Sequence, residues 1–301
     1  MLQKFDDRNR DLVVNINGQL IHRDKAGISP FDSAVQGGDA VWEGLRLYHG
    51  RIFKLHEHLE RLERSARALS FAEIPPHEKI IEEIKRTLAA NKMRDGVHIR
   101  LTVTRGVKIT SGMDPRLNRS GPTLIVLAEH KAPVYAKTGL NLITSKIRRP
   151  PPEVLDAQIH HANLLNSILA KIEANNAGVD DALMLDTRGF VAETNATHIF
   201  IVRDGNLATS RVVACPEGIT RATVIEICGA EKIRCVETDL SVFDVYGAHE
   251  MFCTGTMGEL AAVTKIDNRQ IGDGTVGPMT KRLSDLYTRR TATEGIRVVD
   301  P

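Results

Sequence analysis

The stretch "QIHHANLLNSILAKIEANNAG", Gln158 to Gly178, decides how the second half of the chain is interpreted. Its apolar residues recur at helical spacing, which predicts an amphipathic helix. Two adjacent histidines, His160 and His161, stand at the entrance of this predicted helix. Neighbouring side chains of a helix point apart, and no carboxylate or cysteine follows at ligand spacing, so we expect no metal ion at this pair.

Composition and charge exclude several classes of protein. The 301 residues suffice for two compact domains or for one large one. Forty basic against 38 acidic side chains leave a net charge of +2, which gives no electrostatic footprint for nucleic acid or an anionic membrane. Apolar runs such as Thr123 to Ala128 are far shorter than the roughly 20 residues that span a bilayer. The polar start "MLQKFDDRNRD" is unlike a signal peptide, so we expect a cytoplasmic protein. Four cysteines without CxxC spacing are expected to be reduced core residues: Cys215, Cys228, Cys235 and Cys253.

Residues 1–132 have the pattern of a small α+β domain. The run from Leu12 to Ile21 predicts a hairpin around Asn17-Gly18. Helical spacing follows in "KLHEHLERLERSARALSF" and "HEKIIEEIKRTLAANKM", and the runs Val97 to Gly106 and Pro122 to His130 are typical of strands. Turn residues between His130 and Gly139 indicate a linker, so the chain is divided into domains of residues 1–132 and 133–301.

The second domain is predicted to consist mostly of strands with a few helices. A strand in "LNLITSKIRR" precedes the predicted helix, and three short strands follow it between Asp181 and Ser210. "GITRATVIEICGA" is predicted to be a helix, "AHEMFCTGTMGELAAVTKIDNRQIG" a strand, a turn and a strand, and "PMTKRLSDLYTRRTA" a closing helix.

Four residues are candidates for ligand binding, although each also has an ordinary structural explanation. Thr220 stands at the start of a predicted helix, where backbone N–H groups and a hydroxyl bind phosphate, but where a threonine also caps the helix. Thr256 lies between glycines that allow an anion to approach the backbone or merely form a turn. Glu193 could hydrogen-bond a protonated ring nitrogen or simply cap a turn. Arg61 could bind an anion or simply lie on the charged surface of its helix.

Taken in order, several segments resemble the class IV aminotransferases, the family of branched-chain and D-amino-acid aminotransferases and of aminodeoxychorismate lyase. The similar segments are "GGDAVWEGLRLYHGRIFKLHEHLERLERSA", "IRLTVTRG", "NLLNSILAKIEANNAGVDDALMLDTRGFVAETNATHIFIV", "EGITRATVIEI", "CTGTMGEL" and "IGDGTVGPMTKRL". They extend from about Gly37 to Leu283. The resemblance implies a two-domain α/β fold, a small α+β domain followed by a barrel-like domain, with pyridoxal phosphate between them near a dimer interface.

The resemblance assigns roles to five residues. Arg61 matches the arginine that binds the cofactor phosphate, and Ile219 and Thr220 match the phosphate-binding turn before a helix. Thr256 matches the hydroxyl of the "GT" turn, a further phosphate ligand. Glu193 matches the acid that keeps the pyridine nitrogen protonated, so that the ring accepts electrons from the substrate.

Two more residues are matched to substrate binding. Arg100 in "VHIR" corresponds to the arginine that pairs with the distal carboxylate of glutamate or 2-oxoglutarate, which favours L-amino acids over the D-amino-acid branch. Trp42 stands where the family often has phenylalanine, consistent with an apolar side-chain pocket. Gly37 replaces a tyrosine often found there, which alters this pocket. The expected substrates are therefore a branched-chain or other apolar amino acid and a 2-oxo acid.

One position departs from the family pattern. Aligned without gaps, His160 occupies the place of the lysine that forms the Schiff base with the cofactor. An imidazole moves a proton but does not condense with an aldehyde, so we expect noncovalent pyridoxal phosphate, or pyridoxamine phosphate, with His160 as the acid–base residue. Lys171 lies about 16 Å further along the predicted helix, and Lys146 reaches the site only through an unusual path of the chain. His161 is expected to be structural.

The sequence leaves two classes of function open. The first hypothesis is an aminotransferase that forms a homodimer or higher homo-oligomer. The second is a cofactor-binding pseudoenzyme, or a repurposed cofactor enzyme, because Arg61, Glu193, Thr220 and Thr256 hold the cofactor in either case. A histidine introduced at residue 160 to trap a complex is a third explanation.

Overall fold

The chain folds into two compact units, which we call the N-terminal and the C-terminal unit. The computed structural model describes residues 3–133, 135 and 138–300. The N-terminal unit comprises, within the described residues, 3–132, Ile159–Asn163 and 291–300. The C-terminal unit comprises Pro133–Gln158 and Leu164–Arg290. The predicted linker, residues 130–139, lies partly outside the described residues.

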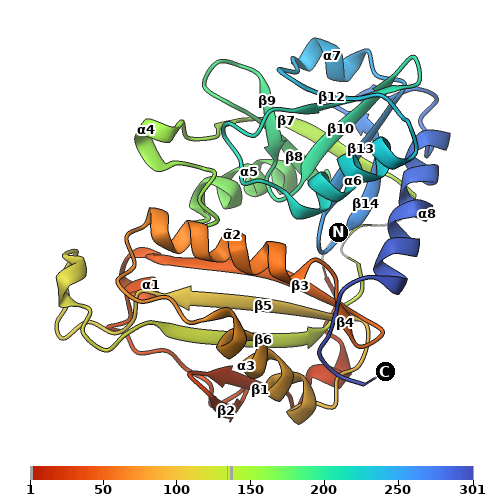
Figure 1. Cartoon of the computed structure of the whole chain (residues 1–301). Coiled ribbons are helices and arrows are strands. Elements are labelled where there is room, and N and C mark those ends of the chain that lie inside the picture. Colours follow the sequence, from red (N-terminus) through yellow and green to blue (C-terminus); the bar gives the residue numbers. More distant parts are fainter. Residues whose placement is uncertain (1–2, 134, 136–137, 301) are drawn as a thin grey trace. The chain divides into compact units, whose positions relative to one another are not determined.

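The N-terminal unit is built on one antiparallel sheet (Figure 1). Its strand order, within the described residues, is β16-β4-β3-β5-β6-β1-β2. The strands are β1 (Val13–Ile16), β2 (Gln19–His22), β3 (Ala40–Tyr48), β4 (Arg51–Ile52), β5 (Val97–Thr104), β6 (Thr123–His130) and β16 (Ile296–Arg297). The helices are α1 (Ser33–Gly37), α2 (Leu55–Ala68) and α3 (His77–Ala90), with short 3-10 turns at Asp7–Asn9 and Pro115–Leu117. This confirms the predicted α+β pattern.

The predicted hairpin is present at the start of this unit. β1 and β2 pair with Ile16 opposite Gln19, and Asn17 and Gly18 form the turn with φ of 49° and 82°. Positive φ at both turn residues matches the right-handed twist of the two strands, which is why Asn-Gly is favoured there.

Alternation along β3 and β5 separates a packed face of this sheet from a polar face. Leu45 on β3 and Ile99 on β5 belong to one core cluster with Leu59 of α2 and Ile84 of α3. The residues between them point to the opposite face, because successive side chains of a strand alternate. That face carries Trp42, Arg46, His98 and Arg100.

The predicted helix at residues 158–178 begins later than expected. Helix α5 spans Leu165–Asn176, and the two histidines lie before it in extended chain. His161 forms a bridge with Val41, and the Trp42 N–H donates to the His160 carbonyl at 3.1 Å. β4 covers only the end of β3, at Leu47 and Tyr48, and the beginning of β3 takes its partner on that side from Ile159–Asn163. This pairing explains why a segment from the second predicted domain groups with the N-terminal unit.

The C-terminal unit contains a second, curled sheet (Figure 1). Its described strands follow the order β12-β11-β10-β13-β14-β7-β8-β9, with β15 paired to β14. Ser210 donates its hydroxyl to the Ala192 carbonyl at 2.6 Å, which ties β11 to β9 across the curled sheet. The strands are β7 (Leu140–Arg148), β8 (Asp181–Leu185), β9 (Val191–Thr194), β10 (His198–Arg203), β11 (Asn206–Ser210), β12 (Cys235–Thr238), β13 (Glu250–Gly255), β14 (Glu259–Ile266) and β15 (Arg269–Gln270). The helices are α4 (Pro152–Leu155), α5, α6 (Ile219–Ala230), α7 (Val242–Tyr246) and α8 (Pro278–Thr293).

Two details of this unit differ from the sequence predictions. The stretch from Asp181 to Ser210 forms four strands rather than three, because a tight turn closed by the Thr194 N–H and the Thr197 carbonyl at 2.7 Å divides the second one. Helix α5 buries the small side chains of Ala170 and Ala174. Its larger apolar side chains are 46–66% exposed: Leu165, Ile168, Leu169 and Ile172.

All four cysteines are free thiols, as predicted; three are buried and Cys235 is half-buried.

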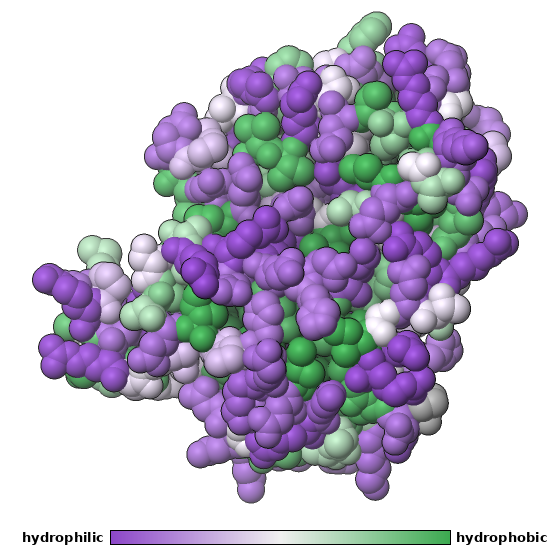
Figure 2. Space-filling view, viewed as in Figure 1, coloured by the Kyte–Doolittle hydropathy of each residue, from purple (hydrophilic) through white to green (hydrophobic). Residues whose placement is uncertain are grey.

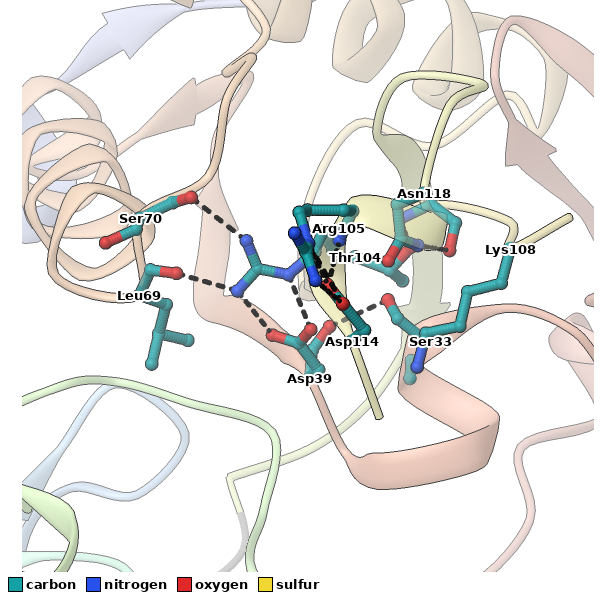
Figure 3. Close-up of polar contacts among 12 residues, drawn as sticks. Ser33, Asp39, Leu69, Ser70, Thr104, Arg105, Lys108, Asp114 and Asn118 are labelled. Atoms are coloured by element: carbon teal, nitrogen blue, oxygen red, sulfur yellow. Dashed lines mark hydrogen bonds and ion pairs between the residues drawn. The ribbon is translucent and has the colours of Figure 1, made fainter. Parts of the chain in front are cut away.

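A clamp around Arg105 fixes the end of β5 (Figure 3). The guanidinium donates to both carboxylate oxygens of Asp39, at 2.6 and 3.0 Å, and to the carbonyls of Leu69 and Ser70 at 2.7 and 3.0 Å. These bonds join the start of β3, the end of α2 and the end of β5. Because these bonds use all three guanidinium nitrogens, we interpret Arg105 as a structural residue.

Polar and charged side chains predominate on the face of the molecule in Figure 2. Among the described residues, no helix has the length and apolar character needed to cross a membrane.

The packed face of the N-terminal sheet gives a direct test of the fold. Replacement of Leu59, which is fully buried on α2, by Ala should lower the free energy of unfolding by about 2–5 kcal/mol, because it leaves a cavity against the sheet. The neighbouring Glu60 is exposed, and Glu60→Ala should change it by less than about 0.5 kcal/mol. Urea unfolding followed by circular dichroism measures both, and equal effects would contradict this packing.

Candidate active site

A buried carboxylate, Glu43, organises the polar groups of the N-terminal unit. It lies on β3 with no exposed surface and accepts from Arg61, at 2.8 Å from Nε to Oε1 and 2.7 Å from Nη2 to Oε2. The His58 Nδ1 lies 2.7 Å from Oε2. His58 and Arg61 are three residues apart on α2, so they share one face of that helix. Burial opposes ionisation, but Arg61 and His160 outweigh it and hold the pKa of Glu43 well below its usual range.

His160 joins this cluster from the edge of the sheet. Its Nδ1 lies 3.2 Å from Oε1 of Glu43, and its backbone N–H donates to Oγ of Ser65 at 3.1 Å. Its ring stacks on Trp42, with centroids 4.4 Å apart, and its side chain is 15% exposed. Burial and the Arg61 charge lower the pKa of His160 below its ordinary value, although Glu43 raises it. The imidazole is therefore neutral at neutral pH.

The two predicted substrate residues lie beside His160. The Arg100 guanidinium carbon is 3.9 Å from the centroid of the Trp42 ring, and Trp42 Nε1 donates to the His161 carbonyl at 3.1 Å. Burial lowers the pKa of Arg100, which remains a cation at neutral pH. The structure thus brings four predicted site residues of the N-terminal unit into one contiguous group: Arg61, His160, Trp42 and Arg100.

His98 is a neutral neighbour of this group. It lies two residues before Arg100 on β5, on the same face of the sheet. Its Nε2 is buried without a hydrogen-bond partner among the described residues. Burial, together with the charges of Lys131, Arg100 and Arg46, lowers its pKa to about 3.

The predicted acid of the C-terminal unit is held in a buried ion pair. Glu193 lies on β9, and its Oε1 is 2.9 Å from Nη2 of Arg149. Arg149 also donates to the Ala214 carbonyl at 3.0 Å and to Oγ of Ser167 at 3.1 Å. Both side chains are at least nine-tenths buried, so the orientation of the Glu193 carboxylate is fixed by its partner.

The predicted phosphate-binding turn forms the start of α6. Gly218 is the N-cap residue and makes no side-chain cap, so the alternative in which Thr220 caps the helix is wrong. Ile219 is the first helical residue, and Thr220 is buried. The N–H groups of this first turn have no intrahelical acceptor and carry the positive end of the helix dipole. A Cβ on Gly218 would lie 2.5 Å from Nδ1 of His198, so only glycine allows this close approach.

The turn of Thr256 lies at the end of β13, next to a hydroxyl without a partner. Thr256 is half-buried in the turn between β13 and β14. Two residues earlier, Oγ1 of Thr254 is buried and finds no hydrogen-bond partner within the part of the chain that the structure describes. Thr254 stands opposite His198 in the pairing of β10 and β13. In the C-terminal unit, His198 therefore contacts both Gly218 of the α6 turn and the β13 end that precedes Thr256.

Sequence reasoning missed five residues that support these groups: Glu43, His58, Arg149, His198 and Thr254. Two of them carried a signal. Glu43 interrupts the apolar strand "AVWEGLRL", and an acid inside a buried strand requires a cation. His58 precedes Arg61 by three residues, so both were bound to lie on one helical face. The other three became visible only through strand pairing and the fold of the C-terminal unit.

Other groups are less suited to chemistry. Lys171 donates to the Asp180 carbonyl and lies 3.2 Å from the Asp181 carboxylate, and Lys146 is exposed on β7. A depression of about 320 Å³ is lined by Arg105, Arg116 and Asn118 among others, but Arg105 is already used by its clamp. No group of three or more potential metal ligands occurs among the described residues.

Comparison with known proteins gives consistent matches along the chain. The sequence model of the family described as amino-transferase class IV matches residues 40–266. "Branched-chain-amino-acid aminotransferase-like protein 2" of Arabidopsis thaliana is 53% identical over 96% of this chain, which spans only about half (52%) of that relative. "Putative branched-chain-amino-acid aminotransferase" of Methanocaldococcus jannaschii is 41% identical over 96% of this chain and 100% of its own length. The T.th. branched-chain amino acid aminotransferase, solved with N-(5'-phosphopyridoxyl)-L-glutamate, superimposes with a TM-score of 0.87 at 34% identity, covering 94% of each chain.

Because His98 is buried in its neutral form, we expect the protein to lose stability in acid. The folded-state pKa of His98 is about 3 against an ordinary 6.5, so on acidification between these values the unfolded chain binds a proton that the folded chain does not. The free energy of unfolding should therefore fall with decreasing pH by up to about 1.4 kcal/mol per pH unit from this residue. His98→Phe should remove this slope, as measured by urea unfolding across the range.

A matched control for this prediction is Leu101→Val on the same strand. It changes a buried, non-titrating side chain and should lower stability equally at every pH. If His98→Phe and the unmodified protein showed parallel pH curves, His98 would not be the responsible group.

The close contact at Gly218 gives a second prediction. Gly218→Ala should lower the free energy of unfolding by about 1–3 kcal/mol, because its methyl group overlaps the His198 ring. Gly229 lies on the same helix with no atom near its Cβ position, so Gly229→Ala should leave stability unchanged or raise it by up to about 1 kcal/mol. Thermal unfolding compares the two variants, and similar midpoints would argue against the tight contact.

Proposed function

The chain belongs to the class IV aminotransferase family, and we propose that it binds pyridoxal phosphate and transfers an amino group between an amino acid and a 2-oxo acid. We further propose a branched-chain or other apolar amino acid and 2-oxoglutarate as the substrate pair. The observation that carries the proposal is the contiguous group in which Glu43 joins Arg61 and His160 while Trp42 joins His160 and Arg100. The ligand of the T.th. enzyme, a phosphopyridoxyl glutamate, supports the cofactor and the dicarboxylate partner.

Each unit, taken by itself, carries groups that suit a phosphorylated pyridine. Arg61 supplies a buried guanidinium, and the start of α6 supplies backbone N–H groups at Ile219 and Thr220. The hydroxyls of Thr256 and of the unpartnered Thr254 add further donors in the C-terminal unit. We assign the phosphate to these groups.

The ring nitrogen is assigned to Glu193. Its buried carboxylate, oriented by Arg149, is the group that would accept from a protonated pyridine nitrogen. When bound, pyridoxal phosphate supplies the aldehyde that carries the amino group and the ring that accepts electrons from the substrate.

The chain's own residues then bind the substrate and move the proton. His160, neutral at neutral pH, takes the proton from the substrate Cα and returns it. Arg100 pairs with the distal carboxylate of 2-oxoglutarate, and Trp42 gives the apolar contact for a hydrophobic side chain. Because residue 160 carries no amine, the cofactor is held noncovalently, as pyridoxal or pyridoxamine phosphate.

Borohydride reduction tests this binding mode. The protein loaded with pyridoxal phosphate should show bound cofactor by absorbance, yet peptide mapping after reduction should find no modified lysine. A covalently labelled lysine, at residue 171, 146 or elsewhere, would overturn the noncovalent assignment. His160→Lys supplies the positive control, because a lysine at that position should become labelled.

The acid–base role of His160 is tested by turnover. His160→Ala should retain the cofactor but lose about 10²–10⁴-fold in kcat with a branched-chain amino acid and 2-oxoglutarate. His161→Ala, which alters a residue paired with β3 through its backbone, is the matched control and should keep the activity. Equal activity of both variants would remove His160 from the mechanism.

The second function left open by the sequence is distinguished by the same experiments. Tight cofactor binding without turnover on any amino acid would identify a cofactor-binding pseudoenzyme, whereas absence of cofactor binding would leave only the fold. The homodimer and the cytoplasmic location stay predictions; sedimentation equilibrium measures the first.

A further inference from the structure

The carboxylate of Glu43 lies between the proposed phosphate ligand Arg61 and the proposed acid–base residue His160. We propose that Glu43 is a positioning residue that keeps the imidazole proton of His160 on Nδ1 and leaves Nε2 as its basic nitrogen. The consequence for catalysis rests on the proposed function. The proton position itself does not, because it follows from contacts within the N-terminal unit.

Glu43 is an acceptor only. Arg61 donates to both of its oxygens at 2.8 and 2.7 Å, and His58 lies 2.7 Å from Oε2. An ionised carboxylate has no proton to give, so every group within hydrogen-bond distance of it must be a donor. The buried Arg61 charge makes the ionised form the stable one in this fully enclosed position.

The proton of His160 must then face Glu43. Nδ1 lies 3.2 Å from Oε1, and a neutral imidazole carries one N–H. With that proton on Nδ1 the contact is a hydrogen bond to a charged acceptor. With the proton on Nε2, two lone pairs would face each other, and the Glu43 carboxylate, which has no exposed surface, would lose this donor. The Nδ1–H tautomer therefore dominates, with the lone pair on Nε2.

The ring is also held in direction. The His160 backbone is fixed by the Ser65 hydroxyl on one side and by the Trp42 N–H on its carbonyl. Stacking on the Trp42 ring fixes the plane of the imidazole. The charged and titratable groups that face His160 are Glu43 of β3 and Arg61 and His58 of α2. Glu43 is the acceptor among them, so it alone distinguishes the two ring nitrogens.

This arrangement couples the two ends of the site. The same carboxylate that orients Arg61 also orients His160, so a change in the ligands of Arg61 alters the acceptor strength that His160 experiences. Loss of the negative charge should leave His160 without a preference for Nδ1–H and should lower its pKa further, because Glu43 is the group that raises it.

Nitrogen-15 NMR of the full chain tests the proton position. With histidine-labelled, cofactor-free protein at neutral pH, we expect the His160 Nε2 signal at the shift of an unprotonated ring nitrogen and Nδ1 at that of a protonated one. His160→Ala assigns the signals. In Glu43→Gln, the Nε2–H tautomer should appear or predominate. An Nε2–H tautomer in the unsubstituted protein would overturn the proposal, and so would an unchanged pattern in Glu43→Gln.

The unsubstituted spectrum keeps the proposal testable even if Glu43→Gln does not fold. Glu63→Gln is the matched control, because Glu63 is a solvent-contacting carboxylate of α2 that pairs with Arg67 and leaves His160 untouched. It should leave the two His160 signals where they are in the unsubstituted protein; the histidine whose surroundings it changes is His77, whose Nε2 lies 3.1 Å from Oε2 of Glu63.

The pH profile of turnover gives the second readout. A base works unprotonated, so a lower His160 pKa in Glu43→Gln should move the acid limb of kcat to lower pH, while kcat itself falls because the ring is no longer aligned. An unmoved limb would contradict the positioning role. If the NMR result holds but no turnover is found with any amino acid, the proposed function fails while the inference on Glu43 stands.

Discussion

Burial of the Glu43 carboxylate is the constraint on which the site of the N-terminal unit depends. A charge without access to water needs a partner of opposite sign, and breaking such a pair typically costs about 3–5 kcal/mol. Arg61 meets this need from α2, and the requirement thereby fixes the register of α2 against β3. His58 follows because it shares that helical face, and His160 follows because the start of β3 is paired with its segment. The polar group is thus a consequence of one buried acid in an otherwise apolar strand.

The C-terminal unit also contains a buried carboxylate paired with an arginine, Glu193 with Arg149. Arg149 leaves the end of β7 and bridges to Glu193 on β9, next to the backbone at Ala214. Here the ion pair joins the ends of two strands that flank β8 in the sheet, whereas Glu43 and Arg61 join a strand to the helix packed on it. Each unit therefore orients a buried carboxylate with a buried arginine of the same unit.

Much of this could be predicted from local patterns. The helical faces of α2 and α3, the Asn17-Gly18 hairpin and the strand pairs around Thr256 are encoded within a few residues, and the structure has them. The resemblance named Arg61, His160, Trp42 and Arg100, which the structure places together. Contacts over long separations, such as Arg149 with Glu193 or His198 with Gly218, could not be predicted, because no local pattern encodes them. The extended backbone at His160 could not be predicted either. The apolar spacing that follows Leu164 is helical, and it led us to begin the predicted helix too early. The segment before Leu164 instead forms its hydrogen bonds with β3.

The pairing of Ile159–Asn163 with β3, and of β16 with β4, has a consequence for biosynthesis. The N-terminal unit is assembled from three separate parts of the chain, the last of which begins at Thr291. A nascent chain generally folds its first domain while the rest is still being made. Here Ile296–Arg297 must be synthesised before β4 gains its second neighbouring strand, so that side of β4 has no strand partner while the C-terminal unit is being made. His160 likewise reaches Glu43 only after residues 133–158, the first part of the C-terminal unit, have been synthesised.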